Sequence, residues 1–241
     1  MKKGMYVSFN LKNFLTLILV FVLAFSLTLA YNSVTVQTTS QLIDTGKTII
    51  VDAGHGGEDG GTQSSAGVLE KDINLAVSLK LGTILRLMGY TVVYTRSEDK
   101  LQYGADAVKQ RQKKVSDIHY RMNIIKNYPG AVFLSIHQNY YAQSKYYGAQ
   151  VFYSKNNEKS QLIADSLQKN LREYLQKDND RQIKASGTDV YLLYHTTTPA
   201  VMVECGFMSN PGEALLLSYD GYQKKLSLAI AAGLEDYGLN S

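Results

Sequence analysis

Four residues of this chain have the types and the placement that metal-assisted hydrolysis requires. His55 follows a strand-like apolar run at residues 48–51, His137 and Glu204 each close another such run, and Glu70 opens a helix-like stretch. Two imidazoles and one carboxylate are a known ligand set for catalytic zinc, with a fourth position left for water. A further carboxylate could then act as a general base. The set therefore indicates a metallohydrolase.

Each of these residues also has a purely structural interpretation. His55 could be a histidine of a glycine-rich loop, and His137 a strand-end residue satisfied by hydrogen bonds. Spacing alone leaves both interpretations open, because the chain has no compact motif such as His-Glu-x-x-His. Glu70 suits the first turn of a helix, where the macrodipole favours a carboxylate. Glu204 is harder to explain in this way, because burying a charge at the end of an apolar strand is costly without a partner.

The four residues need a scaffold that brings distant parts of the chain together. Short apolar runs predict strands at residues 48–51, 91–94, 132–136, 150–153, 191–194 and 200–203. Helical spacing of apolar residues predicts helices over residues 73–88, 162–175 and 222–237, and another that ends at residue 127. This alternation predicts an α/β single domain with a mixed, mostly parallel central sheet flanked by helices. Active sites in such sheets gather at the carboxyl ends of strands, which gives the four residues a shared cleft.

The first thirty residues are typical of an exported protein. Three lysines precede or begin an apolar run of 17 residues, from Phe14 to Ala30, which is at the lower edge of the ~17–25 residues that span a bilayer. We expect residues 1–30 to be a signal peptide or an N-terminal membrane anchor, residues 31–47 a linker and residues 48–241 the catalytic domain. The protein is then exported to the cell envelope, either secreted or membrane-anchored on the outer face.

The charge balance argues against nucleic-acid binding, and the position of the single cysteine argues against a catalytic thiol. Beyond residue 30 the chain carries 22 basic and 21 acidic residues, because three of its 25 basic residues lie before that point. No basic patch indicates a nucleic-acid partner. The lone Cys205 excludes an internal disulfide framework, and strand alternation turns it away from Glu204. We therefore expect a buried thiol rather than a nucleophile.

Four separated motifs now support a resemblance. The chain resembles the zinc-dependent N-acetylmuramoyl-L-alanine amidases of the third amidase family over about residues 48–237. The motifs that carry the resemblance, in family order, are Asp52-Ala53-Gly54-His55-Gly56-Gly57, Glu70-Lys71 with Asn74-Leu75, Ser135-Ile136-His137-Gln138-Asn139, and the run from Pro199 through Glu204 to Asn210. The fit is looser near Lys126-Asn127 and between Tyr141 and Gly148.

The resemblance implies roles for the residues named above. His55, Glu70 and His137 would be the zinc ligands, and Glu204 the catalytic glutamate. The substrate would be peptidoglycan, cleaved at the amide between N-acetylmuramic acid and the L-alanine of the stem peptide. Thr95, Arg96 and Arg121 resemble family positions with structural roles. Four tyrosines after the third motif would form either the rim of the cleft or ordinary surface: Tyr140, Tyr141, Tyr146 and Tyr147.

The overall plan of the chain resembles the germination-specific spore-cortex amidases, which remove stem peptides so that muramic-δ-lactam can form. The resemblance implies a role in the spore cortex and a place in the forespore–mother cell intermembrane space. Because the chain lacks wall-binding repeats, we also expect an activating or scaffolding protein partner. The alternatives are a vegetative cell-wall autolysin of the same chemistry, a zinc exopeptidase, and a non-catalytic wall-binding protein. His119 and His195 are expected to lie at the surface or the rim rather than among the ligands.

Overall fold

The computed structural model describes residues 11–39 and 44–238, and the chain divides into two compact units, Met1–Ile43 and Asp44–Ser241. In the first unit, helix α1 (Leu11–Thr39) includes residues 31–39 of the expected linker. Residues 1–10 of the expected export segment and residues 40–43 of the linker lie outside the described residues. Among the described residues, no helix combines the length and hydropathy that crossing a bilayer requires. The division into export segment, linker and catalytic domain stays a prediction.

The second unit is built on a six-stranded sheet with the strand order β2-β1-β3-β6-β4-β5. Its strands are β1 (Thr48–Ala53), β2 (Thr91–Tyr94), β3 (Val132–Asn139), β4 (Gln150–Tyr153), β5 (Lys184–Ala185) and β6 (Ala200–Phe207). All neighbouring strands run parallel except β4 and β6, which are antiparallel. The mixed, mostly parallel sheet expected from the sequence is therefore confirmed.

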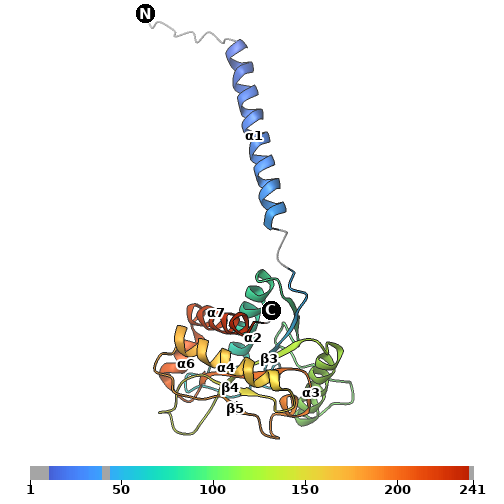
Figure 1. Ribbon diagram of the computed structural model, residues 1–241, viewed down its shortest axis with the longest axis vertical. Coiled ribbons are helices and arrows are strands. Elements are labelled where there is room, and N and C mark those ends of the chain that lie inside the picture. The colour runs from blue at the N-terminus through green and yellow to red at the C-terminus, as the bar shows by residue number, and fades with distance from the viewer. Residues whose placement is uncertain (1–10, 40–43, 239–241) are drawn as a thin grey trace, which may run out of the picture. The chain divides into compact units, whose positions relative to one another are not determined.

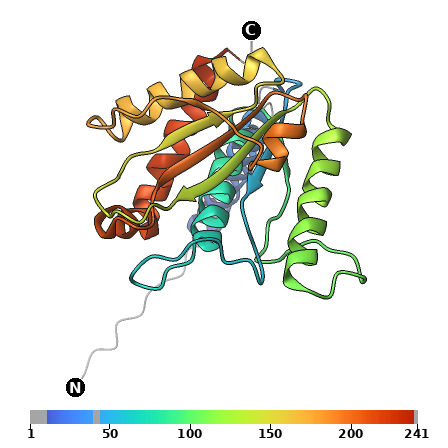
Figure 2. The same ribbon diagram turned by 90° about the horizontal axis from the view of Figure 1, so that it is seen from below.

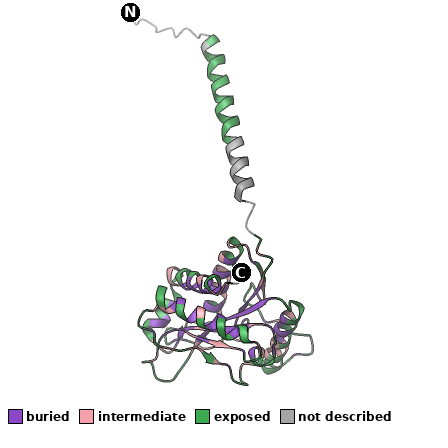
Figure 3. Cartoon of the chain, viewed as in Figure 1, coloured by how far each residue is buried: buried purple, intermediate pink, exposed green. Residues whose placement is uncertain are grey.

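Helices cover both faces of this sheet. One face packs against α2 (Glu70–Leu87), α4 (Glu158–Tyr174) and α7 (Asp220–Asp236), and the other against α3 (Gln110–Asn127) and α5 (Tyr191–His195). Figure 1 shows α3 standing apart from α2, α4 and α7, and Figure 2 shows it alongside the sheet from below. Buried residues gather on the strands and on the inner sides of these helices, as Figure 3 shows.

Side-chain alternation decides which residues face which layer. Along β1, Ile49 and Val51 belong to the larger core with α2, α4 and α7, whereas Ile50 belongs to the smaller core beneath α3 and α5. Along β6, Val201 and Val203 face the larger core, and Met202 faces the smaller one. Continuing the period of two, Asp52, Ser135, His137 and Glu204 all lie on the side of α3 and α5. The candidate residues that lie on β3 and β6 therefore share one face of the sheet with Asp52 and Ser135.

Three elements differ from the sequence prediction. The predicted strand at residues 191–194 was wrong, because these residues form the one-turn helix α5, in which Leu193 alone is fully buried. A four-residue apolar run cannot by itself distinguish a strand from a buried helical turn. The prediction also lacked the two-residue strand β5 and the helix α6 (Pro211–Ser218). Helix α6 has clear start signals, since Asn210 caps the backbone N–H of Glu213 and Pro211 occupies the first turn.

Candidate metal centre

Strand register brings the four candidate residues together at one edge of the sheet. His137 on β3 and Glu204 on β6 are direct partners in the parallel ladder. His55 follows the end of β1, which is the other neighbour of β3, and Glu70 is the first residue of α2. All four therefore reach the same cleft from four different elements, as the topology of an α/β sheet predicts.

Two imidazoles and one carboxylate form a compact cluster. The possible ligand atoms of His55, Glu70 and His137 all lie within 4.8 Å of one another. Glu70 Oε1 is 3.3 Å from His55 Nε2 and 3.1 Å from His137 Nδ1, and the two rings are 5.0 Å apart between centroids. Such a group is the donor set that tetrahedral zinc prefers. The residues present therefore fit a zinc ion.

Glu70 is held in place from three sides. Its Oε1 accepts hydrogen bonds from the backbone N–H of Gln138 at 3.0 Å and from Asn74 Nδ2 at 3.2 Å. Its Oε2 accepts the backbone N–H of Thr62 at 2.9 Å. Burial raises the pKa of Glu70, but hydrogen bonds and charge from His137 and His55 outweigh burial and hold it well below the usual range. A carboxylate that is oriented by these donors and has a lowered pKa suits a metal ligand.

His55 has an unusual backbone. Its φ of +61° lies in the left-handed region, where no other described residue except glycine is found. The Nδ1 atom of its ring is 2.9 Å from Asp59 Oδ2, and its Nε2 faces Glu70. Burial lowers the pKa of His55, but hydrogen bonds to Asp59 and Glu70 outweigh it and raise the pKa to about 9. The ring is therefore fixed between two carboxylates.

Glu204 is the unpaired member of the cluster. Its Oε2 is buried and has no hydrogen-bond partner, and it lies beside His137 rather than among the three ligand atoms. Burial raises the pKa of Glu204 to about 7, against the opposing charge of His137. A carboxylate with a free oxygen and a pKa near neutrality is suited to take up and release a proton. Glu204 differs in this from Glu70, because both carboxylate oxygens of Glu70 already accept hydrogen bonds.

Behind the cluster, a buried ion pair supports the backbone that carries His55. Asp52 accepts hydrogen bonds from Thr95 at 2.6 Å, Ser135 at 2.5 Å and Arg121 at 2.6 Å. Arg121 also donates to Asp117 and to the carbonyl oxygens of Ala53 and His55, each at 2.7 Å. Although burial raises the pKa of Asp52, these donors hold it below its usual value. The structural role expected for Thr95 and Arg121 agrees with these contacts.

Replacing Arg121 with Met is expected to destabilise the fold by about 3–5 kcal/mol, because removing one partner of a buried ion pair leaves an unpaired charge. The Arg121 side chain is only 5% exposed. The free energy of unfolding in urea is the measurement. The matched control is Lys224→Met, which breaks the exposed i,i+4 pair with Asp220. A loss for Arg121→Met no larger than for this control would contradict the assigned role.

A glycine provides the space for His137. A Cβ atom added to Gly54 would meet His137 Nε2 at 2.2 Å, so alanine at this position must push the imidazole aside. We expect Gly54→Ala to weaken zinc binding by about 10–100-fold, the range typical of changes that disturb ligand orientation. A chelator-competition titration measures this. Gly130→Ala is the control, because nothing lies within 4 Å of an added Cβ there. Equal zinc affinities in the two variants would refute the expectation.

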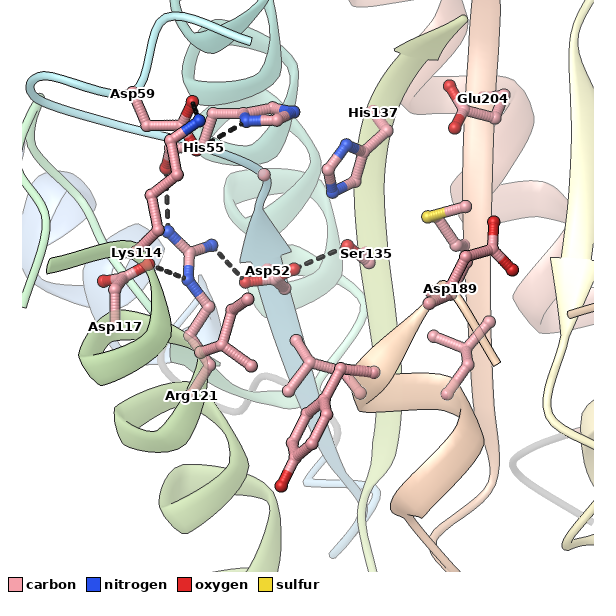
Figure 4. A pocket seen from close by; sticks show the side chains of 17 residues that line it. Asp52, His55, Asp59, Lys114, Asp117, Arg121, Ser135, His137, Asp189 and Glu204 are labelled. Atoms are coloured by element: carbon pink, nitrogen blue, oxygen red, sulfur yellow. Dashed lines mark hydrogen bonds and ion pairs between the residues drawn. The ribbon is translucent and has the colours of Figure 1, made fainter. Parts of the chain in front are cut away.

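The cluster opens into a cavity of about 350 Å³. Its floor is the face of the sheet with Asp52, Ser135 and Met202, and its walls are α3 and the segment that begins α5. Figure 4 shows His55, His137 and Glu204 at one end of the cavity, with Asp189 below Glu204 and opposite the α3 residues Asp117 and Arg121. Since the walls extend well beyond the cluster, the cavity has room for a substrate group next to the metal ligands.

The remaining candidates from the sequence lie elsewhere. His119 and His195 are exposed and do not belong to the described metal cluster, and Cys205 is fully buried in the larger core. Four tyrosines that were considered for the rim do not line the cavity: Tyr140, Tyr141, Tyr146 and Tyr147. Sequence reasoning missed Asp59 and Lys114. A carboxylate four residues after His55 was a signal for the first, but nothing local pointed to the second.

Comparison with known proteins gives one consistent result. The family model of N-acetylmuramoyl-L-alanine amidases (Amidase_3) matches residues 49–236. A germination-specific N-acetylmuramoyl-L-alanine amidase of Bacillus subtilis is 33% identical over 192 residues, which are 80% of each chain. The CwlD amidase of Clostridioides difficile, solved in complex with the GerS lipoprotein, is 42% identical with a TM-score of 0.76 over 79% of this chain and 98% of that one. An N-acetylmuramoyl-L-alanine amidase from Clostridium difficile 630 is 28% identical with a TM-score of 0.69, over 79% of this chain and 96% of that one.

Proposed function

The chain belongs to the N-acetylmuramoyl-L-alanine amidase family, and we propose that it hydrolyses its amide substrate with a zinc ion held by His55, Glu70 and His137. The observation that carries the proposal is the convergence of these three side chains beside Glu204, whose buried Oε2 has no hydrogen-bond partner. Imidazole nitrogens favour zinc over magnesium or calcium, which prefer all-oxygen sites. A zinc ion held by these residues would supply Lewis-acid polarisation of the scissile carbonyl and a lowered pKa of water.

Side chains of the protein would carry out proton transfer, position the metal ligands and exclude water. Glu204 takes the proton of the attacking water on its free oxygen and passes it to the departing amine of L-alanine. Asn74 and Gln138 hold Glu70, so that the ligand carboxylate does not swing towards Glu204. The walls of the cavity, from α3 and α5, exclude bulk water from one side of the reacting amide. The result is amide hydrolysis that separates the glycan strand from the stem peptide.

The activity is expected to fall at acid pH as Glu204 becomes protonated. A general base must be ionised, and burial raises the pKa of Glu204 from 4.5 to about 7. Because a neighbouring dication lowers the pKa of a carboxylate, we expect the midpoint of the acid limb in kcat between these two values. The measurement is kcat at saturating zinc across the acid range. If the residual kcat of Glu204→Gln fell at acid pH with the same midpoint, the titrating group would be a residue other than Glu204.

We further propose that the substrate is spore-cortex peptidoglycan, where removal of stem peptides allows muramic-δ-lactam to form. Support comes from the similarity to a germination-specific amidase and to CwlD. Spores that lack the protein should contain cortex without muramic-δ-lactam, and wild-type protein, but not Glu204→Gln, should restore it. Mass spectrometry of cortex muropeptides measures this. A normal muramic-δ-lactam content in the deletion strain would favour the vegetative autolysin instead.

A protein partner and an extracytoplasmic site belong to the same proposal. The CwlD amidase was solved with the GerS lipoprotein, which supports an activating or scaffolding partner for this chain as well. Peptidoglycan lies outside the cytoplasmic membrane, so we propose that residues 1–30 act as a signal peptide or anchor, and that the enzyme works between forespore and mother cell. Full activity of the purified chain alone would contradict the need for a partner. Cytoplasmic retention of a tagged chain would contradict export.

A further inference from the structure

The ring of His55 is held from behind by a second carboxylate, Asp59. Asp59 Oδ2 lies 2.9 Å from His55 Nδ1, on the side of the ring opposite to Glu70. The backbone of Asp59 exchanges two hydrogen bonds of 2.9 Å with Gly56, which closes the turn that carries His55. The Asp59 side chain is only 14% exposed. The position of the Asp59 carboxylate relative to His55 is therefore fixed by the backbone of the turn.

An acceptor at this position selects one state of the imidazole. A carboxylate beside Nδ1 favours the tautomer with its proton on Nδ1, which leaves the lone pair on Nε2. Nε2 is the atom that faces Glu70. Histidines that bind metals commonly donate their other N–H to a carboxylate in this way, and the donation fixes the direction of the ring. His55 needs such support because its left-handed backbone is a strained starting point.

The second oxygen of Asp59 is paired with a residue of helix α3. Lys114 Nζ lies 2.6 Å from Asp59 Oδ1, so the two oxygens of one carboxylate bridge α3 and His55. The same helix holds the other end of this turn, since Arg121 donates to the carbonyl oxygen of His55 at 2.7 Å. Figure 4 shows Lys114, Asp59 and His55 in sequence along the edge of the cavity. Helix α3 thereby controls both the backbone and the ring of His55.

We propose that Asp59 and Lys114 form a positioning pair that sets the tautomer and direction of the His55 ring and so tightens zinc binding. The pair acts through His55 and touches neither the metal nor the reacting amide. This inference rests on the zinc centre proposed above. It assigns functions to two residues outside the three ligands and Glu204, and it makes α3 part of the metal centre.

The test compares zinc dissociation constants of full-length variants by competition with a chromophoric chelator. Asp59→Ala should raise the dissociation constant by about 10–100-fold. Asp59→Asn keeps an oxygen that can accept a hydrogen bond from Nδ1–H. Its zinc dissociation constant should therefore lie between those of Asp59→Ala and wild type. Lys114→Met should weaken binding less than Asp59→Ala does. Adding Lys114→Met to Asp59→Ala should cause no further loss, because Lys114 acts through Asp59.

The neighbouring residue supplies a matched control. Lys113 is on the same helix and pairs with Glu58 at 2.5 Å, whereas the hydrogen bonds and ion pairs of the His55 side chain go to Asp59 and Glu70. Lys113→Met should leave the zinc dissociation constant unchanged within about twofold, and near-UV circular dichroism should show that every variant is folded. In the zinc-loaded wild type, an NMR signal of the His55 Nδ1 proton should exchange slowly with solvent, and Asp59→Ala should lose this protection.

The possible outcomes separate the two proposals. If the wild-type chain itself binds no zinc, the proposed metal centre fails. If wild type binds zinc and folded Asp59→Ala binds it equally tightly, the metal centre stands and the positioning pair is refuted. An equal loss from Lys113→Met and Lys114→Met would also refute the pair, because it would reflect a general charge effect of α3.

Discussion

Replacing Glu204 with Gln is expected to lower kcat on muropeptides by about 10²–10⁴-fold while zinc remains bound. Glutamine keeps the shape of the side chain but cannot accept a proton. Glu204 is the member of the cluster with a free buried oxygen, and burial raises its pKa to about 7, as suits a group that takes up and releases a proton. Steady-state kinetics and the zinc content of the same preparation are the two measurements.

The control for Glu204→Gln is Glu98→Gln, a substitution of an exposed glutamate whose side chain is 68% accessible. It should leave both kcat and zinc content unchanged. A Glu204→Gln enzyme with wild-type kcat would exclude Glu204 as the base. A variant that lost its zinc together with its activity would instead place Glu204 among the ligands.

Replacing His137 with Ala is expected to abolish both zinc binding and activity. The substitution removes one of three donors, and the loss should exceed the about 10–100-fold change typical of residues that only orient a ligand. The side chain is 22% exposed and lies two residues before the end of β3, so the fold itself should survive. Elemental analysis after gel filtration and the rate on muropeptides are the measurements.

Two other histidines make this prediction specific. His119→Ala and His195→Ala alter exposed rings that lie outside the described metal cluster, and both variants should retain zinc and activity. Retention of one equivalent of zinc by His137→Ala at the wild-type affinity would contradict the assigned ligand set. The contrast with Glu204→Gln is diagnostic, because His137→Ala is expected to lose the metal and Glu204→Gln only the proton acceptor.

Much of this site could be predicted because its residues interrupt strong local patterns. A histidine or glutamate at the end of an apolar strand stands out, and strand ends converge in an α/β sheet whatever the length of the connections. The parallel pairing of His137 with Glu204 was not predictable from either strand alone, but it follows once β3 and β6 are neighbours. The same reasoning applies to Asp52, whose charge at the end of β1 was an equally clear signal.

What escaped prediction depends on distances between separate elements. Nothing near Lys114 in the sequence shows that it meets Asp59, 55 residues earlier, because that contact depends on how α3 packs across the turn. The apolar run of helix α5 is too short to show a period, so the sequence predicts a strand there, whereas in the fold these residues form a helical turn that buries Leu193 in the smaller core. Tertiary packing therefore determined these features, whereas local patterning pointed to the candidate residues and the family motifs implied their roles.

The most direct test of the zinc amidase mechanism is hydrolysis of purified muropeptides in ¹⁸O-labelled water by the zinc-loaded, full-length protein. Attack of water on the amide carbonyl predicts that each released stem peptide begins with a free amino group on L-alanine. The label then appears in the lactyl carboxylate of muramic acid. Glu204→Gln, with its zinc retained, should release almost none. Peptides that lack L-alanine, label found within the peptide, or undiminished release by Glu204→Gln would contradict the mechanism.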